Sequence, residues 1–412
     1  MIRQSELSLV IDSQKEYLTS RKNELLREAL PLVPVVDTFA TIVTGLRRCG
    51  KCTLLLQLAD NHHYKKTIYL NFDDIRLAGF EVSDFDRLHS DIERRETKVL
   101  FFDEIQLVKG WEIFIHQLLR EGFTVFISGS NASMLSVDLG THLTGRHIPM
   151  ELFPFSFTEF LAFTRQTASV KSVQEYMKVG GIPEYVKSRA RIVLNTLLED
   201  ILVRDIAINK NVREVDSLKH LAVYLLSNAG NLVSANKLVG LFGLHYTSTI
   251  LEYISYFKDA YLIGQVPQFS YSMKVQARNP KKVYAMDMGL IDAVSTSFTD
   301  DSGHKLENLI YLFLRKTSEE VFYFKDKGKC DFVTFEKKQP VSAIQVCLHL
   351  TSENLDREYR GVIAAMKAFK LSEGTIVTLE EKDRFEKEGL VVNVVPAYEF
   401  LITTLQKKRS FS

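Results

Sequence analysis

Short apolar runs of strand length alternate with helical stretches between residues 35 and 150, and this alternation restricts the fold more than any other feature of the chain. Strands separated in sequence by helices are typical of a parallel sheet that is covered by helices on both faces. We therefore predict an α/β domain at 35–150. The predicted strands are Thr41–Val43, Thr67–Asn71, Val99–Phe102 and Thr124–Ser128, and the predicted helices are Lys51–Leu58, Asp84–Glu96 and Trp111–Glu121.

A glycine-bearing loop joins the first predicted strand to the first predicted helix. Its sequence, GLRRCGKCT, satisfies seven of the eight positions of the phosphate-binding pattern G-x-x-x-x-G-K-[ST]. In such a P-loop the backbone N–H groups converge on anionic oxygens, the helix N-terminus adds a positive dipole, and the lysine reaches the β and γ phosphates. We predict an ATP site formed by Gly45, Arg48, Cys49, Gly50, Lys51, Cys52 and Thr53.

Cys52 stands where a serine or threonine hydroxyl normally coordinates Mg²⁺. A thiol is a soft ligand and suits this hard cation poorly. Thr53 does not simply replace it, because one helical step turns the side chain by about 100 degrees. We expect nucleotide binding to survive better than metal-dependent hydrolysis. Cys49 and Cys52 also form a C-x-x-C pair, for which a disulfide that disables the loop is an alternative.

Two carboxylates, Asp103 and Glu104, follow the apolar strand Val99–Phe102. In phosphoryl-transfer sites one such acid holds the Mg²⁺ shell and a second residue orients the attacking water. We expect Asp103 to be a metal ligand beside position 52, and Asp103 and Glu104 to act in catalysis. Many buried strands end in an acid, so the pattern gains its meaning from the phosphate loop that precedes it.

The next predicted strand ends in SGSN, and an arginine follows in the run TGR. Asn131 or Ser130 is a candidate sensor of the γ phosphate, with a plain turn as the alternative. Arg146 is a candidate for stabilising transition-state charge, either in its own chain or in a neighbouring subunit of a homo-oligomer. A surface arginine is the alternative.

The length of 412 residues allows two or three domains of roughly 100–200 residues each. The net charge of +1 gives no whole-chain attraction to nucleic acid, so any DNA contact must come from a local patch. The N-terminus does not resemble a secretory signal, and no apolar run approaches the ~18–20 residues of a membrane helix. Four scattered cysteines favour a reducing compartment. We expect a cytoplasmic protein without membrane contact.

Outside the α/β domain, the pattern predicts an N-terminal helical segment at 1–34 and a helical lid or connector at 151–214. Residues 215–290 show three helices followed by two β-rich pieces, the order of a winged helix-turn-helix. Residues 303–405 predict a third, small α/β domain. The elements predicted for 215–290 are Asp216–Asn228, Ser234–Phe242 with Ser234 as N-cap, Tyr246–Asp259, Tyr261–Tyr271 and Lys282–Ala285.

The predicted wing is basic, which favours contact with DNA phosphates. The predicted recognition helix Tyr246–Asp259 is a poorer reader of DNA, since it carries Glu252 and Asp259 against Lys258. A protein-docking module with a solvated basic turn is the alternative. The wing cations are Lys274, Arg278, Lys281 and Lys282.

Taken in order, the motifs GLRRCGK, VLFFDEIQ, SGSNASML, LTGRHIPMELFPFSFTEFL and VGGIPEYV resemble those of prokaryotic AAA-superfamily ATPases that carry a C-terminal domain of unknown function. KDKGKCDFV and AIQVC extend the resemblance toward the C-terminus. It implies an AAA-type core that binds ATP, a winged helix, and a C-terminal region similar to restriction-endonuclease folds. Members normally have serine or threonine at position 52.

An endonuclease-like site needs a metal held by an aspartate and a second carboxylate, with a lysine two residues further on. Glu307 and Asp331 are candidate cation ligands, but Gln345 and Cys347 stand where the second acid and the lysine belong. Only Lys325 or Lys327 on an adjacent strand offers a substitute cation. We predict a nuclease-like domain without catalytic activity.

Two functions lead from the sequence, and a true nuclease that cuts with a metal at Asp331 is a third option. The first is an ATPase, slow because of Cys52, in which the nucleotide state repositions the winged helix and the C-terminal domain. The second is a nucleotide-binding but hydrolysis-deficient regulator that binds DNA or a protein partner.

Overall fold

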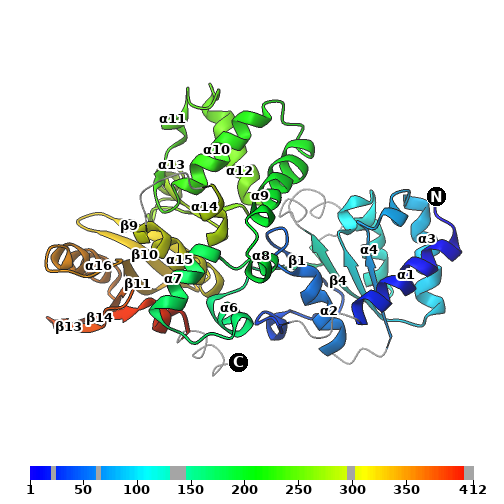
Figure 1. The fold of residues 1–412 in the computed structure, drawn as a ribbon, viewed down its shortest axis with the longest axis horizontal. Helices are drawn as coiled ribbons and strands as arrows, with labels where there is room; N and C mark the ends of the chain where they lie inside the picture. The colour runs from blue at the N-terminus through cyan, green and yellow to red at the C-terminus, as the bar shows by residue number, and fades with distance from the viewer. Residues whose placement is uncertain (20–24, 62–65, 130–144, 295–301, 403–412) are drawn as a thin grey trace. The chain divides into compact units, whose positions relative to one another are not determined.

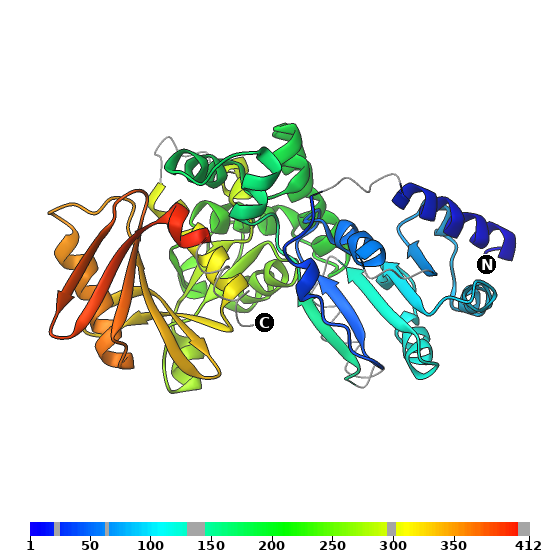
Figure 2. The same cartoon turned by 90° about the horizontal axis from the view of Figure 1, so that it is seen from below.

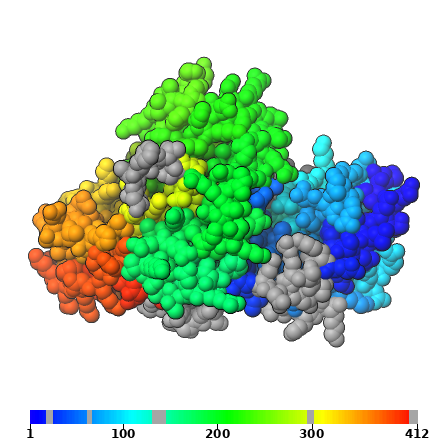
Figure 3. Space-filling model, viewed as in Figure 1, coloured from blue at the N-terminus to red at the C-terminus, as the bar shows by residue number. Residues whose placement is uncertain are grey.

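The computed structural model describes residues 1–412 except 20–24, 62–65, 130–144, 295–301 and 403–412 (Figure 1). The chain forms two compact units: the first comprises Met1–Phe153 with Asp259–Tyr261, and the second comprises Pro154–Lys258 with Leu262–Ser412. Figure 3 shows them as space-filling surfaces coloured along the chain. Over the described ranges, no helix combines the length and apolar character that a membrane span requires.

A five-stranded parallel sheet forms the centre of the first unit. Its strand order is β2-β3-β4-β1-β5, and every neighbouring pair runs parallel (Figure 2). The four strands predicted from the sequence are confirmed, but β5 was not anticipated. Pro149 interrupts its apolar pattern, and such a residue is tolerated because β5 is an edge strand. The bounds are β1 Ala40–Thr44, β2 Thr67–Asn71, β3 Val99–Asp103, β4 Thr124–Gly129 and β5 His147–Glu151.

Helices cover both faces of this sheet, as predicted. One face packs on α1, α3 and α4 through a buried cluster that includes Leu100, Phe102 and Ile127. The alternate residues point to the other face, where the rings of Phe101 and Phe126 stack 4.9 Å apart and where α2 contacts β3 and β4. The bounds are α1 Gln4–Thr19, α2 Lys51–Asn61, α3 Phe85–Arg94 and α4 Trp111–Arg120.

The prediction of a helical segment over 1–34 is only partly correct. Helix α1 ends at Thr19, residues 25–29 are not helical, and Leu30–Leu32 form one 3₁₀ turn. Pro31 and Pro34 explain the end of the segment, because proline restricts the residue before it and removes a backbone donor. The extended part is held by Gln57 of α2, whose side chain bonds the backbone of Leu25 and Arg27.

The first part of the second unit is helical. Helix α9 continues into a π-helical turn, Asp200–Ile208. The predicted helix Ser234–Phe242 shortens to α11, and Ser234 occupies the N-cap position without a capping side-chain bond. Helix α13 lies between the two predicted β-rich pieces, in the predicted basic wing. The bounds are α6 Phe157–Thr164, α7 Val170–Val179, α8 Pro183–Ser188, α9 Ile192–Glu199, α10 Val215–Ser227, α11 Ala235–Leu238, α12 Thr247–Asp259, α13 Met273–Arg278 and α14 Met288–Val294.

Two sheets complete this unit. A small antiparallel sheet has the order β6-β8-β7, and a mixed sheet has the order β13-β14-β12-β11-β10-β9, with α16 packed on its core (orange to red in Figure 2). Strand β13, with the sequence DRFEK, is not predicted from the sequence, because this exposed edge strand has no alternation of apolar and polar residues. The bounds are β6 Leu232–Val233, β7 Ile263–Val266, β8 Lys281–Ala285, α15 Ser302–Thr317, β9 Glu320–Lys325, β10 Lys329–Glu336, β11 Gln339–Val346, α16 Leu355–Phe369, β12 Glu373–Thr378, β13 Asp383–Lys387 and β14 Leu390–Pro396.

The VGGIPEYV motif has a structural explanation in the second unit. The buried carboxylate of Asp287 accepts the backbone N–H of Gly181 at 2.7 Å and that of Gly289 at 2.9 Å. A Cβ at Gly180 would lie 2.4 Å from Asp287 Oδ1, and this glycine has a φ of +73°. The paired glycines therefore let the chain before α8 close around the carboxylate that precedes α14.

Asp287→Ala should lower the free energy of unfolding by about 3 kcal/mol or more, because two buried N–H donors lose their acceptor at about 1–3 kcal/mol each. Asp287→Asn, which keeps one acceptor oxygen, should cost less. Denaturant unfolding of the three proteins measures the difference. Equal stability of wild type and Asp287→Ala would contradict this role.

Candidate nucleotide-binding site

The phosphate loop lies between the carboxyl end of β1 and the first residue of α2, where the sequence predicts it. Gly45 has a φ of +145°, and a Cβ there would lie 2.1 Å from the Leu152 carbonyl oxygen. Gly50 has a φ of +101°, and a Cβ there would lie 2.7 Å from Arg27 Nη1. Both conformations strain any residue with a side chain, so glycine is required twice for the loop to pass its neighbours.

Lys51 is held inside the loop. Its ammonium donates to the carbonyl oxygens of Gly45 at 3.1 Å and Leu46 at 3.2 Å, and the residue is buried. These bonds keep a positive charge beside the N-terminus of α2. Loop N–H groups, helix dipole and ammonium together form a site for anionic oxygens.

Asp103 is the centre of the acidic side of the site. Its carboxylate accepts bonds from Tyr69 Oη at 2.8 Å and from Ser128 Oγ. The thiol of Cys52 also bonds to Asp103. These residues come from β3, β2, β4 and α2, so the prediction that positions 52 and 103 meet is supported by the geometry. Tyr69 and Ser128 are site residues that the sequence does not predict, and the one signal for Ser128 is its position at a strand end beside Asp103.

The thiol of Cys52 fits Mg²⁺ poorly. Burial, and then the nearby Asp103 carboxylate, raise the pKa of this thiol well above its usual value. A thiol that keeps its proton donates to Asp103 instead of coordinating a metal, because the thiolate is the ligand form. Asp103 itself offers the hard oxygen that Mg²⁺ prefers. The donor set therefore suits Mg²⁺ at Asp103 and not at Cys52.

Glu104 adopts a left-handed backbone conformation, with a φ of +54°, which is uncommon for a residue with a side chain. Its N–H pairs with the Ser128 carbonyl at 3.0 Å, and Gln106 donates to its carboxylate. Burial raises the pKa of Glu104 to about 7, although the Lys51 ammonium opposes the shift. A carboxylate with this pKa suits proton transfer near neutral pH.

Arg27 is a neighbour of the loop that sequence reasoning missed. Its guanidinium donates to the Cys49 carbonyl at 2.7 Å and to the Phe153 carbonyl at 2.8 Å, and the side chain is buried. It thereby ties the phosphate loop to the chain that follows β5. No local motif marks Arg27, because its partners lie 22 and 126 residues away.

Arg146 does not lie at the predicted site within its own chain. Its carbonyl accepts the N–H of Ala40, the first residue of β1, whereas the phosphate loop follows Thr44, the last residue. Four residue steps of a strand place it about 13 Å from the loop edge. This position favours a role in a neighbouring copy, or a plain surface arginine, over a contact with the phosphate loop of its own chain. Ser130 and Asn131 lie outside the described residues.

The remaining loop residues have local roles. Arg48 has a φ of +62°, and Arg48 and Thr53 are half-buried. Cys49 is buried, its Sγ lies 3.3 Å from the Leu152 carbonyl, and burial raises the pKa of its thiol. Both loop cysteines are free thiols, so the structure contains no Cys49–Cys52 disulfide.

The second unit corrects two further expectations. Lys282 is no DNA contact, because it is buried and its ammonium bonds Glu307 at 2.6 Å and Asp331 at 2.8 Å. Glu307 and Asp331 do come together, as candidate cation ligands should. Their cation is this lysine of β8, however, and not the exposed Lys325 or Lys327.

Two family models match the chain. Residues 37–161 match the family described as an AAA domain, and residues 170–301 match a domain of unknown function. The first range contains the whole parallel sheet, the phosphate loop, Asp103 and Glu104. Residues 37–161 therefore form an AAA-type nucleotide-binding domain of the P-loop ATPase class.

The relatives extend over most of the chain. It is 32% identical over 402 residues to "Uncharacterized protein MJ1544" of Methanocaldococcus jannaschii, covering 90% of both chains. A Haemophilus influenzae protein is 28% identical, with 81% of this chain and 88% of the relative covered. The chain belongs to the family of the M. jannaschii protein.

Solved structures with detectable similarity include DnaA bound to AMPPCP and single-stranded DNA, with 15% identity and a TM-score of 0.31, covering 57% of this chain and 90% of that one. Cdc6p of Pyrobaculum aerophilum shows 12% identity and a TM-score of 0.27, with 71% and 91% covered. The assignment of the class rests on the family match and on the phosphate loop.

Arg27→Ala should weaken ATP binding about tenfold, because charge-assisted hydrogen bonds contribute about 1.5–3 kcal/mol and one of them orders the loop. Arg27→Lys keeps the charge but cannot bridge two carbonyls with a planar fork, so it should recover only part of the affinity. Fluorescent-nucleotide titration measures both. Unchanged affinity in Arg27→Ala would remove Arg27 from the site.

Proposed function

We propose that this protein binds ATP at the loop Gly45–Thr53 and uses the nucleotide state to control its second unit, with slow hydrolysis. The observation that carries the proposal is the meeting of three groups at one edge of the parallel sheet. These are the Lys51 ammonium, the Asp103 carboxylate and the Glu104 carboxylate. In P-loop enzymes catalysis is almost entirely positioning and charge stabilisation, and these groups suit both tasks.

Each residue has a definite role in this proposal. The loop N–H groups and Lys51 hold the β and γ phosphates, and Asp103 is held in place by Tyr69 and Ser128. Glu104 orients the attacking water and accepts its proton. Mg²⁺, held by Asp103 and not by Cys52, would supply neutralisation of the phosphate charge. Arg146 of a neighbouring copy is the proposed source of any arginine contact, which would make a homo-oligomer the active form.

A hydrolysis-deficient regulator is the alternative form of this function, and Cys52 is the observation that favours it. The thiol bonds to Asp103, the residue that must face the cation. In that case ATP binding alone would set the state of the second unit.

Cys52→Ser should raise kcat by about tenfold or more, since each ~1.4 kcal/mol of transition-state stabilisation is worth tenfold in rate. A hydroxyl restores a hard oxygen ligand, whereas the matched variant Cys52→Ala removes the thiol without adding one. Steady-state phosphate release with Mg²⁺ under reducing conditions measures all three proteins.

Control variants distinguish the slow ATPase from the hydrolysis-deficient regulator. Lys51→Ala should abolish ATP binding in either case. A wild type that turns over at the rate of Cys52→Ser would show that the thiol is tolerated. Binding without turnover in both would establish the regulator, and absence of ATP binding in wild type and Cys52→Ser would refute the whole proposal.

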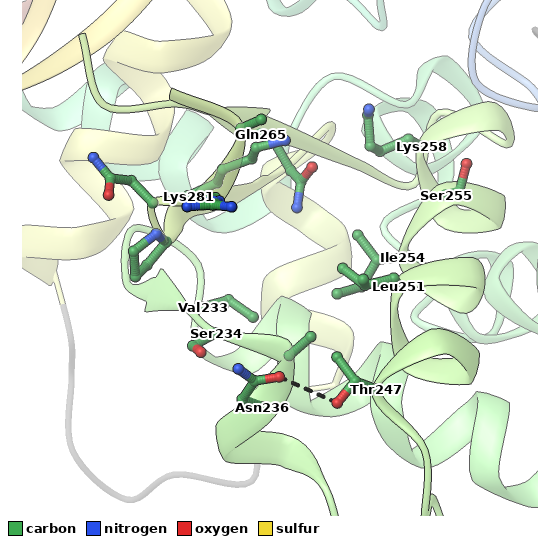
Figure 4. A pocket seen from close by; sticks show the side chains of 15 residues that line it. Val233, Ser234, Asn236, Thr247, Leu251, Ile254, Ser255, Lys258, Gln265 and Lys281 are labelled. Carbon is green, nitrogen blue, oxygen red and sulfur yellow. Dashed lines mark hydrogen bonds between the residues drawn. The ribbon is translucent and has the colours of Figure 1, made fainter. Parts of the chain in front are cut away.

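Nucleic acid is the second candidate ligand, at residues 215–290, which we propose to act as a winged helix. A cavity of about 400 Å³ lies between α12 on one side and residues 233–236 and 277–281 on the other (Figure 4). Leu251 and Ile254 lie on the α12 side, with Gln265 and Lys281 on the sheet side. Its lining includes the cations Lys258, Arg278 and Lys281 and no carboxylate, whereas Lys274 and Lys282 are not part of it.

This distribution favours an anionic ligand, and phosphate contacts supply most of the non-specific affinity for nucleic acids. We therefore propose a contact surface that includes the cavity beside the predicted recognition helix as well as the wing. An acidic protein partner is the alternative occupant.

Arg278→Ala combined with Lys281→Ala should weaken duplex DNA binding and reduce the slope of log K against log salt by about 2, because each lost phosphate contact contributes about 0.9. The matched double variant Lys171→Ala with Lys187→Ala removes two exposed cations outside residues 215–290 and should leave the slope unchanged. Fluorescence anisotropy at several salt concentrations measures it. An equal effect of both double variants would show that the cavity is not the site.

A further inference from the structure

Three charged side chains from separate elements meet in the interior of the second unit. Lys282 of β8 places its ammonium 2.6 Å from Glu307 Oε1 of α15 and 2.8 Å from Asp331 Oδ1 of β10. Tyr284, also on β8, donates to the same Glu307 oxygen at 2.7 Å. Residues 282, 307 and 331 are far apart in sequence, so the fold alone creates this cluster.

The cluster is shielded from water. The Lys282 side chain is 2% exposed, that of Asp331 4% and that of Glu307 12%. Aromatic rings surround it: Phe332 has its ring centre 5.8 Å from the ammonium, and Tyr284 stacks on Tyr311. Buried carboxylates in such surroundings need an opposite charge and hydrogen-bond donors, because desolvation of an unpaired charge costs several kcal/mol.

The directions of the pKa shifts agree with the geometry: the charges of Lys282 and of the two carboxylates stabilise one another. Burial by itself lowers the pKa of Lys282, but the carboxylates of Asp331 and Glu307 outweigh it and raise the pKa. Burial and the neighbouring Asp331 raise the pKa of Glu307, and Lys282 opposes that rise. Loss of the ammonium would therefore leave two buried carboxylates that repel each other.

The surroundings offer no second buried cation among the described residues. Lys329 Nζ is 4.0 Å from Asp331 Oδ1, but its side chain is 57% exposed. Gln345 is neutral and bridges the Asp331 N–H to Glu358. The thiol of Cys347 bonds the His349 carbonyl instead of the acids. Lys282 is thus the one buried group here that balances the carboxylate charge.

We infer that the Lys282 ammonium occupies a two-carboxylate site, formed by Glu307 and Asp331, that would bind a hard divalent cation such as Mg²⁺ or Mn²⁺ if the ammonium were removed. Two carboxylate oxygens that converge on one point are the donors such ions take, at about 2.0–2.6 Å. Asp331 is oriented further by the Val346 N–H, which donates to its second oxygen at 3.2 Å. The backbone thereby holds one ligand ready whichever cation is present.

The consequence is that β8 is locked to α15 and β10 without metal, and that metal-dependent phosphodiester chemistry is blocked at this position. The inference is independent of ATP binding, since none of these residues belongs to the phosphate loop. The sequence suggests Lys325 or Lys327 as the cation near these acids. In the structure this cation is Lys282 of β8, a strand that lies outside residues 303–405.

The test is Lys282→Met in the full chain, with nucleotide omitted. Methionine fills similar volume without charge. We expect this variant to melt at a lower temperature than wild type, to bind one additional Mn²⁺ per chain by calorimetry, and to recover its melting temperature in millimolar Mn²⁺. Wild type should show neither the additional Mn²⁺ nor the shift. Addition of Asp331→Asn to Lys282→Met should abolish both effects.

A second variant keeps the test decisive if Lys282→Met does not fold. Lys282→Met with Glu307→Gln leaves one carboxylate and so has the same net charge as the native cluster. It should fold and gain a smaller Mn²⁺-dependent rise in melting temperature, which adding Asp331→Asn removes. Folded Lys282→Met that neither binds Mn²⁺ nor is stabilised by it would overturn the inference. So would a folded double variant that is indifferent to Mn²⁺.

Discussion

The parallel arrangement of β1, β3 and β4 is the constraint on which the nucleotide site depends. Parallel strands bring their carboxyl ends to one edge of the sheet, and ligands bind at that edge in open α/β sheets. The strands themselves are buried on both faces, so their polar groups gather where they end. Asp103 lies directly opposite Ser128 in the ladder, and the phosphate loop leaves β1 beside them. Loss of this alignment would separate Lys51 from the acids.

Two buried carboxylates of this protein, those of Asp103 and Asp331, are stabilised by different kinds of partner. Asp103 receives neutral donors, the hydroxyls of Ser128 and Tyr69 and the thiol of Cys52, and so keeps its capacity to attract a cation. Asp331 meets the ammonium of Lys282 instead. The contrast follows from desolvation: an interior charge is stable with an opposite charge or with several donors, and each solution leaves the site a different chemistry.

The sequence predicted those parts of the fold that have a strong local signal. Apolar strands with no charged residue, such as Val99–Phe102, were located to within one residue. Strand β5 contains Pro149 and strand β13 is charged, so neither shows the expected alternation, and only pairing with a neighbour makes them strands. In the site, Lys51 and Asp103 were found by spacing. Tyr69 and Arg27 were not, because their partners are distant along the chain.

The sequence by itself determined the phosphate loop, because its glycines, lysine and flanking strand and helix lie within one short segment and act through backbone geometry. It also determined that a thiol stands at position 52, where P-loops normally place a hydroxyl ligand for Mg²⁺. Only the tertiary structure decided which cations of the basic run around residue 280 are accessible and which is buried. Arg278 and Lys281 line a cavity, and Lys282 one residue later is buried against two acids. Successive residues of a strand point to opposite faces, so one step along β8 separates a solvated cation from an interior one.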